Sequence, residues 1–318
     1  VILGILLANI DDLEGNNFTS IQWYEKAYAL GSRLACGNLA AAYLEGVGVK
    51  RNAKKAFQYL EEAANKGSAS DALSAGQCKA YGIGTNQSDD EAYKWLLFAA
   101  HNGEREAQYY LATIEDMLPN ITLSDEVKME WLAEAVRRGF PPAIRELGGK
   151  FLYGAGGKKD VEKGIGLLQQ AASLSDAEAK YLLGRAYDFG ELVAKNRKLA
   201  VNYYKDAADN GSAAAHSNYG LALFNGSGVE RDLDAAEYHF NTALEMGELQ
   251  GAIGLGFCHA YKRDRVKALG YIEYAINAVS DDEIEGADIR DKLIDEMTDA
   301  ELTEAREFTK LIQVAFCN

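Results

Sequence analysis

The sequence repeats with a period of 36 residues, and this repeat limits the possible fold more than any other feature. Alanine recurs at that spacing without a slip, at Ala27, Ala63, Ala99, Ala135, Ala171, Ala207 and Ala243. Four residues after each alanine stands a glycine or, once, a serine: Gly31, Gly67, Gly103, Gly139, Ser175, Gly211 and Gly247. Four residues before each alanine stands a bulky residue: Trp23, Tyr59, Trp95, Trp131, Leu167, Tyr203 and His239. Three sequence positions that all recur every 36 residues predict a stack of copies of one structural unit.

Each period predicts two helices, and the second of them begins at a capping residue. The candidate N-caps, all with side chains that accept hydrogen bonds from first-turn amides, are Asn16, Asn52, Ser88, Ser124, Asp160, Asn196, Asp232 and Asp264. After each cap, a small residue, the bulky residue and the alanine follow at i, i+3 and i+7, which is one face of a helix. The phased aromatic residues are therefore expected in the core. The glycine suits the left-handed position that ends a helix.

The first helix of each period contains a position that takes only small residues. They are Gly4, Ala40, Gly76, Ala112, Gly148, Gly184, Gly220 and Gly256. Glycine inside a helix costs about 1 kcal/mol relative to alanine, so a packing requirement is expected there. Close approach of the paired helix would supply that requirement.

Composition excludes several classes of protein. The 318 residues are 48% hydrophobic and 25% charged, which is ordinary for a folded protein, and only 3 are proline. The formal net charge of −15 argues against nucleic acid or an anionic membrane as a partner. No apolar run in the visible chain is long enough for a membrane span.

The repeats resemble the SEL-one-like repeat (SLR) family, which is related to tetratricopeptide repeats. Stretches such as AAYLEGVGVKRNAKKAFQYLEEAANKG (41–67) and YGLALFNGSGVERDLDAAEYHFNTALEMG (219–247) carry the resemblance. It implies an all-α fold, a right-handed αα-superhelix or solenoid of about eight helical hairpins. The expected copies are 1–32, 33–68, 69–104, 105–140, 141–176, 177–212, 213–248 and 249–280, followed by an acidic helical cap at 281–318. The resemblance also implies that the protein acts as an adaptor. Similarity to bacterial members of the family favours export of the protein, with any signal sequence upstream of Val1.

No catalytic, cofactor or metal site is predicted. The GAGGKK stretch at 154–159 resembles a phosphate-binding loop, but it lacks the required Ser or Thr and fits the turn between helices. A Ser-x-x-Lys nucleophile, found in relatives described as β-lactamases, is missing from the sequence. His216, His239 and His259 fall on three successive helices, which leaves a surface metal cluster conceivable, although packing is the simpler interpretation. Cys78 and Cys258 share one register and are expected to be buried rather than reactive.

One stripe of the first helices is predicted to bind a partner. In tetratricopeptide-like solenoids this helix lines the concave face, and its residues here include types favoured at interfaces. The candidate binding residues are Asn38, Gln77, Tyr81, Tyr110, Tyr153, Arg185, Phe189, Asn218, Phe257 and Tyr261. The alternative is that residues just before the turns, such as Tyr81, Tyr153 and Phe189, fold back over the hairpin end.

The C-terminal segment is acidic and amphipathic. The segment from Asp281 to Glu307 contains twelve acidic and three basic residues, so most of the chain's net negative charge is concentrated there. Apolar residues recur through 289–312 at helical spacing, which predicts a helix pair that caps the array, as a solenoid requires. The alternative is an acidic dock for a basic partner, and both roles are compatible.

These observations together predict a non-catalytic scaffold or adaptor that binds a protein or peptide on the concave face. A narrower alternative is an immunity or inhibitor protein that sequesters a bacterial toxin or secreted enzyme; its acidic surface would suit a basic partner. A glycan-binding module and a hydrolase are further alternatives. The sequence does not indicate the oligomeric state.

Overall fold

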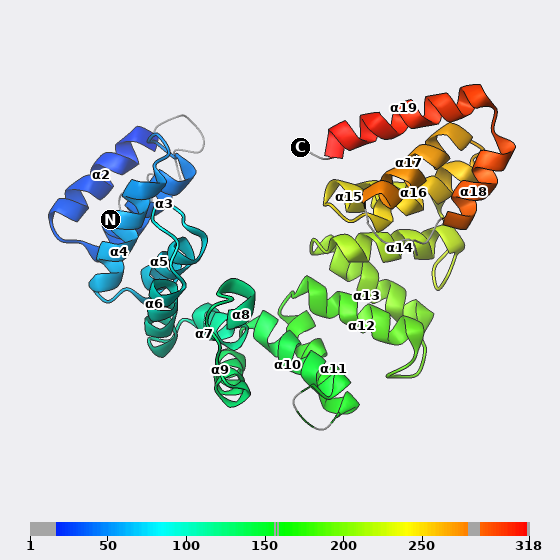
Figure 1. The fold of residues 1–318 in the computed structure, drawn as a ribbon. Coiled ribbons are helices and arrows are strands. Elements are labelled where there is room, and N and C mark those ends of the chain that lie inside the picture. The colour runs from blue at the N-terminus through cyan, green and yellow to red at the C-terminus, as the bar shows by residue number, and fades with distance from the viewer. Residues whose placement is uncertain (1–16, 156, 158, 279–286, 317–318) are drawn as a thin grey trace. The chain divides into compact units, whose positions relative to one another are not determined.

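The computed structural model describes residues 17–155, 157, 159–278 and 287–316, and these residues form eighteen helices and no strand (Figure 1). The chain divides into two compact units, Val1–Ala143 and Ile144–Asn318. The helices of the first unit are α2 (Asn17–Ala29), α3 (Arg33–Glu45), α4 (Ala53–Asn65), α5 (Ala69–Tyr81), α6 (Asp89–His101), α7 (Arg105–Ala112), α8 (Ile114–Met117) and α9 (Asp125–Arg137). The boundary falls inside α10 (Pro141–Tyr153). The second unit continues with α11 (Val161–Ser173), α12 (Ala177–Phe189), α13 (Arg197–Asp209), α14 (Ala213–Asn225), α15 (Leu233–Glu245), α16 (Gln250–Tyr261), α17 (Arg265–Ala278), α18 (Ala287–Glu296) and α19 (Asp299–Phe316).

Within each unit the helices pack as hairpins that follow the 36-residue period. The first helix of a copy packs against the second, as α5 does on α6 and α14 on α15, and the second packs against the first helix of the next copy. The predicted all-α hairpin repeat is therefore confirmed. The apolar face of each hairpin is covered only by the neighbouring hairpins, so the copies stabilise one another.

The predicted N-caps cap their helices wherever the structure describes them. Each side chain accepts a hydrogen bond from a first-turn amide, and the capping residues are Asn52, Ser88, Ser124, Asp160, Asn196, Asp232 and Asp264. Such a cap contributes about 1 kcal/mol to helix stability. Asn16 lies outside the described residues.

The residue that ends each second helix adopts the left-handed conformation predicted for it. The glycines at this position have φ between 69° and 95°, and they are Gly31, Gly67, Gly103, Gly139, Gly211 and Gly247. Ser175 takes the same position with φ of 65°, and it is one of two non-glycine residues with positive φ in the described chain. A side chain is disfavoured in this conformation because its Cβ approaches the following carbonyl oxygen.

Replacing Ser175 with glycine is therefore expected to stabilise the protein by about 1 kcal/mol. Ser175 is exposed, so the substitution removes backbone strain and little packing. Urea denaturation followed by circular dichroism measures the change. The matched control is Gly211→Ser, which places a serine at the equivalent residue with φ of 89° and should destabilise the protein by a similar amount. An unchanged or lower stability of Ser175→Gly would contradict the strain argument.

The small residues of the first helices lie where the paired helix comes closest. A Cβ atom added to the glycines at this position would lie 3.2–3.3 Å from a carbonyl oxygen of the second helix; the glycines are Gly76, Gly148, Gly184, Gly220 and Gly256. The facing carbonyls belong to the small residue four positions after each cap. These residues are Ala92, Gly164, Ala200, Ala236 and Ala268. Two small residues thus let the two backbones approach, which confirms the predicted close approach.

The expectation that the phased aromatic residues form the core is wrong in detail. Trp23 is 39% exposed, and Tyr59 and Tyr203 are only partly buried, at the edge of the stripe. Tyr59 stacks on Tyr43 of the paired helix at 5.9 Å between ring centroids, and Tyr203 stacks on Tyr187 in the same way. The residue that follows each phased position is buried in every copy: Tyr24, Leu60, Leu96, Leu132, Leu168, Tyr204, Phe240 and Ile272. The buried stripe therefore runs i, i+4, i+7 rather than i, i+3, i+7.

The copy at 105–140 departs from the pattern where the sequence lacks turn glycines. Helix α7 ends at Ala112, Thr113 leaves the helical conformation with ψ of 35°, and the short α8 follows. Ile114 and Leu118 are fully buried in this segment. Core packing by these two side chains therefore directs the chain here, in place of the glycine turn used by other copies.

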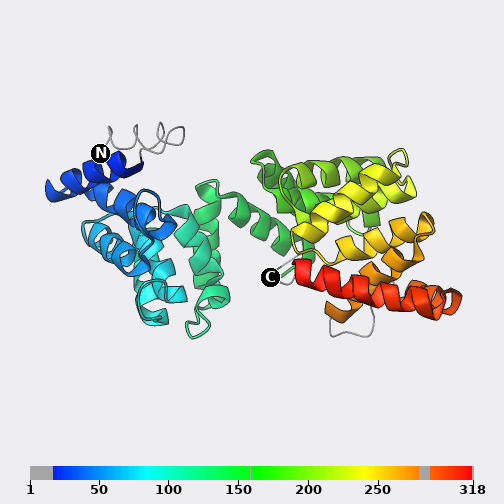
Figure 2. The same cartoon turned by 90° about the horizontal axis from the view of Figure 1, so that it is seen from above.

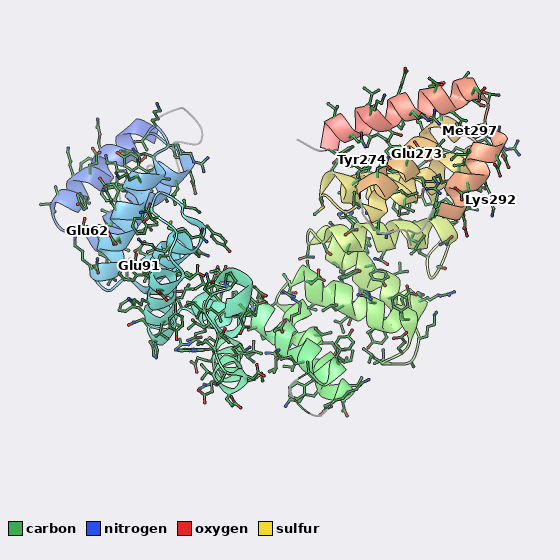
Figure 3. The ribbon with its side chains drawn as sticks, in the orientation of Figure 1. Glu62, Glu91, Glu273, Tyr274, Lys292 and Met297 are labelled. Atoms are coloured by element: carbon green, nitrogen blue, oxygen red, sulfur yellow. The ribbon has the colours of Figure 1, made fainter. Side chains whose placement is uncertain are left out.

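Helices α18 and α19 pack on the last hairpin as the predicted cap. Both pack against α17, and α19 lies along it (Figures 1 and 2). Gly270 of α17 makes room for Phe308 of α19, because a Cβ atom there would lie 2.5 Å from the Phe308 ring. Met297, in the turn between α18 and α19, packs against the same buried cluster as Leu293 (Figure 3). Residues 281–286, the start of the acidic run, lie outside the described residues.

Cys78 and Cys258 are buried, as predicted, and so is Cys36. Cys36, Cys78 and Cys258 are free thiols inside the core, and burial raises the pKa of Cys258 to about 11. These thiols are therefore packing residues rather than nucleophiles. Among the described helices, none is long and apolar enough to cross a membrane.

Candidate functional site

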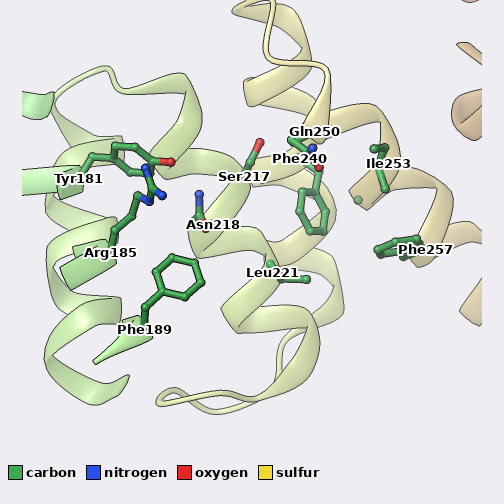
Figure 4. Close-up of a pocket in the computed structure, with 11 residues that line it drawn as sticks. Tyr181, Arg185, Phe189, Ser217, Asn218, Leu221, Phe240, Gln250, Ile253 and Phe257 are labelled. Atoms are coloured by element: carbon green, nitrogen blue, oxygen red, sulfur yellow. The ribbon is translucent and has the colours of Figure 1, made fainter. Parts of the chain in front are cut away.

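The first helices of three successive copies line an open cavity in the second unit. It lies between α12, α14 and α16 and has a volume of about 350 Å³ (Figure 4). Its walls are formed by Tyr181, Arg185, Phe189, Ser217, Asn218, Leu221, Phe240, Gln250, Ile253, Gly254 and Phe257. We call this space the α12–α16 cavity. Its mixed apolar and polar lining is typical of a ligand site.

Four of the ten predicted binding residues line this cavity: Arg185, Phe189, Asn218 and Phe257. A smaller hollow of about 70 Å³ adjoins it and shares Arg185 and Phe189 with it. A fifth predicted residue, Tyr153 of α10, lines that hollow together with Leu152, Leu182 and Leu192. The structure thus brings together five predicted residues from four first helices.

Three predicted aromatic residues just before the turns are largely exposed. Tyr81 is 61% exposed, Tyr153 is 68% exposed and Phe189 is 60% exposed. An aromatic ring left this exposed on a helix surface is available to a partner. Exposure of this degree favours a binding face over the alternative that these three side chains cover the hairpin ends.

Arg185 provides the charge of the α12–α16 cavity. Its guanidinium lies 5.8 Å from the ring centre of Tyr181 and 5.7 Å from that of Phe189, one helical turn away on either side. Within the described part of the chain, it forms no ion pair and no hydrogen bond. Glu178, nearer the start of α12, does not line the cavity. Burial raises the pKa of its carboxyl, whereas the positive charges of Arg145 and Arg185 lower it.

Seven of the eleven lining residues were not among the predicted binding residues, and Tyr181 and Phe240 were missed for different reasons. Tyr181 lies one turn before Arg185, so helical spacing could have found it. Phe240 belongs to the second helix α15, and its ring reaches the cavity because Gly220 and Gly254 have no side chains. A Cβ atom on Gly220 would lie 3.0 Å from that ring. No sequence pattern of the first helices predicts this contribution.

Tyr261 lies at the end of its hairpin rather than in the cavity. Its ring meets Phe224 edge-on at 6.3 Å, and the Arg231 guanidinium lies 4.4 Å from its centre. Phe257 contacts the same Phe224 at 6.4 Å and also lines the cavity. Tyr261 therefore supports the turn between α14 and α15.

In the first unit, two predicted residues form one polar contact. The Tyr110 hydroxyl donates a hydrogen bond to Glu106 at 2.7 Å and accepts one from Gln77 Nε2 at 3.3 Å. Burial and the Glu106 carboxylate raise the pKa of Tyr110 to about 12. Asn38, on α3, is half-buried and lines none of the cavities described above. These residues lie on first helices, as predicted.

The histidines serve packing in the described structure. His216 and His239 share a hydrogen bond between their Nδ1 atoms at 2.8 Å, and His259 stacks on Tyr271. No group of three or more possible metal ligands occurs among the residues that the structure describes. His101 Nδ1 donates a hydrogen bond to the Leu97 carbonyl oxygen, within its own helix.

Stacked helical hairpins with one lined face define a repeat scaffold suited to protein–protein interaction. The family model of the Sel1 repeat matches residues 11–32, 33–68, 72–104, 141–176, 177–212 and 213–248, more than half of the chain. The chain belongs to the Sel1 repeat family. The copy at 105–140, in which the first helix is broken, is not matched.

Solved structures and a curated relative share this fold or sequence. The chain is similar to c5321, a protective antigen of uropathogenic Escherichia coli with an SLR fold, at 26% identity and a TM-score of 0.79, over 94% of this chain and 64% of that one. A Sel1 repeat protein from Oxalobacter formigenes matches with a TM-score of 0.67 and 23% identity, over 88% of this chain and 81% of that one. The chitin synthase regulator SKT5 of Malassezia restricta is 30% identical over 142 residues, which are 44% of this chain and a tenth of that protein.

Proposed function

We propose that this protein is a non-catalytic scaffold that binds a protein or an extended peptide on the first-helix face of its repeats. The observation that carries the proposal is the α12–α16 cavity, which joins side chains from three successive copies. A binding site made by several copies exists only when the repeats are stacked, so it uses what the repeat architecture provides. In the first unit, the predicted residues Gln77, Tyr81 and Tyr110 lie on the corresponding first helices of that unit.

The lining supports binding rather than catalysis. Its polar groups are an arginine, two amides, a tyrosine and a serine, without a histidine or carboxylate positioned to activate a nucleophile. Aromatic rings and arginine are the residue types that dominate binding energy at protein interfaces. The immunity-protein alternative is a special case of this proposal, in which the partner is a toxin held in a tight one-to-one complex.

Affinity capture with matched surface variants tests the proposal. In the face variant Arg185, Phe189 and Leu221 become alanine, and in the control Leu174, Tyr238 and Met246 of the second-helix side become alanine. All six side chains are exposed, and circular dichroism verifies that both variants fold. We expect a partner retained by the wild type and the control at equal yield, with at least about a tenfold lower yield for the face variant. Equal retention by all three proteins would contradict a first-helix binding face.

A further inference from the structure

We propose that the α12–α16 cavity binds an acidic side chain of an extended partner segment, with bulky apolar side chains on both sides of that residue. The inference rests on the proposed function and makes it specific, since it names the chemistry of the partner. It comes from three observations: an arginine without a partner, a buried hydroxyl without a partner, and apolar walls on two sides.

The arginine sets the sign of the ligand's charge. In a chain with a formal net charge of −15, acidic residues are plentiful, yet Arg185 pairs with none of those described. Its guanidinium lies within cation–π distance of the Tyr181 and Phe189 rings, which favours this position at the cavity. A positioned guanidinium binds a carboxylate through two parallel N–H donors, and the bond is stronger than one between neutral groups. A cationic side chain would be repelled at the same place.

The hydroxyl of Ser217 is a second polar group at the cavity without a partner in the described part of the chain. Ser217 is only 6% exposed, its Oγ is buried, and it has no hydrogen-bond partner among the described residues. A buried hydroxyl left unpaired costs free energy, so one that lines a cavity indicates a ligand that completes the bond. Asn218 beside it donates to the Ala214 carbonyl at 2.9 Å, which orients its side chain (Figure 4).

Apolar groups on either side of Arg185 favour an extended segment over an isolated anion. Leu221, Ile253 and Phe257 form one side of the α12–α16 cavity. The smaller hollow, lined by Leu152 and Leu182 among others, continues the site past Phe189, with Glu191 as its acidic residue. Because both spaces share Arg185, one bound chain can place its acidic residue there and an apolar side chain in each.

Binding of blocked peptides tests the proposal. The probes are seven-residue peptides, acetylated and amidated, with central glutamate and either leucine or phenylalanine at one or two positions on each side. Twin peptides carry glutamine or lysine at the centre, and a third set carries a free C-terminal carboxylate with central glutamine. Fluorescence anisotropy with the full chain measures each Kd. We expect glutamate peptides to bind at least about tenfold more tightly than their glutamine twins.

Three variants assign the effect to the cavity. Arg185→Gln should abolish the preference for glutamate, whereas the control Lys198→Gln, the same charge change at an exposed residue outside the lining, should keep it. Ser217→Ala should weaken glutamate binding several-fold without lowering the thermal midpoint, because it removes a hydroxyl that is unpaired in the free protein.

Several outcomes would overturn the proposal. They are equal or tighter binding of the glutamine or lysine twins, a glutamate preference that survives in Arg185→Gln, and binding that requires the free C-terminus. Binding of free glutamate as tight as that of the peptides would overturn the extended-segment part. If the face variant loses its captured partner while the peptides show no acidic preference, the proposed function stands and this inference alone fails.

Discussion

Replacing Gly251 with alanine is expected to lower the free energy of unfolding by about 2 kcal/mol, although alanine is the better helix former. Gly251 lies in α16, where a Cβ atom would be 2.5 Å from the Phe240 carbonyl oxygen and 2.7 Å from the Leu244 amide nitrogen. Both atoms belong to the backbone of α15, so no side-chain rotation relieves the clash. Valine at this position should destabilise the protein further.

The matched control is the same substitution at a helical glycine with open space around it. Gly166 of α11 has no atom within 4 Å of an added Cβ, and it is exposed. Gly166→Ala should therefore stabilise the protein by about 1 kcal/mol through helix propensity. Urea denaturation of the three proteins measures both effects. Stabilisation by Gly251→Ala would show that α15 and α16 do not pack as closely as the structure has them.

Acidification is expected to destabilise the protein through a buried histidine pair. The hydrogen bond between the Nδ1 atoms of His216 and His239 requires one ring to donate and the other to accept, so the accepting ring must be neutral. Burial and the neighbouring His216 lower the pKa of His239 to about 4, and burial lowers the pKa of His216. Between about 6.5 and 4, the unfolded chain therefore binds more protons than the folded protein. The stabilisation is complete above about pH 6.5 and is lost as the pH falls toward 4.

The substitution His239→Tyr should remove about 2 kcal/mol of this pH dependence. Tyrosine stands at the equivalent position in three other copies, and two of these tyrosines, Tyr59 and Tyr203, stack on a tyrosine of the paired helix. Tyr219 lies 4.7 Å from the His239 ring and is available for the same contact. Urea denaturation at pH 7 and pH 4.5 measures the difference between wild type and variant. Equal pH dependence in the two proteins would show that His239 is not the titrating group. Burial also lowers the pKa of His259, but His259 is present in both proteins, so its contribution cancels in the comparison.

The proposed function and its acidic ligand depend on different residues, which makes them separable. The scaffold function follows from a face shared by several copies, and five predicted residues meet on it in the second unit. The ligand chemistry depends on Arg185 and Ser217, which belong to two neighbouring copies and break the repeat pattern. Repeat proteins place specificity at positions that differ between copies, because identical positions serve packing.

The helices, their starts and their ends were predictable because each depends on short-range chemistry. An asparagine such as Asn52 caps the amide of a residue three positions later, and a glycine such as Gly67 adopts a left-handed conformation within its own turn. The broken helix at Thr113 was signalled only by missing turn glycines. Its course depends on Ile114 and Leu118 entering the core, which is a contact between elements.

The sequence by itself determined the repeat, the hairpins, the caps and the first-helix stripe that contains Arg185 and Phe189. Only the tertiary structure decided which stripe residues share a cavity, because that depends on how neighbouring copies pack. Phe240 reaches the cavity from a second helix through the space left by Gly254, and Ser217 is buried there without a partner. Periodicity describes one helix at a time, whereas a binding site is a property of side chains that meet from several helices.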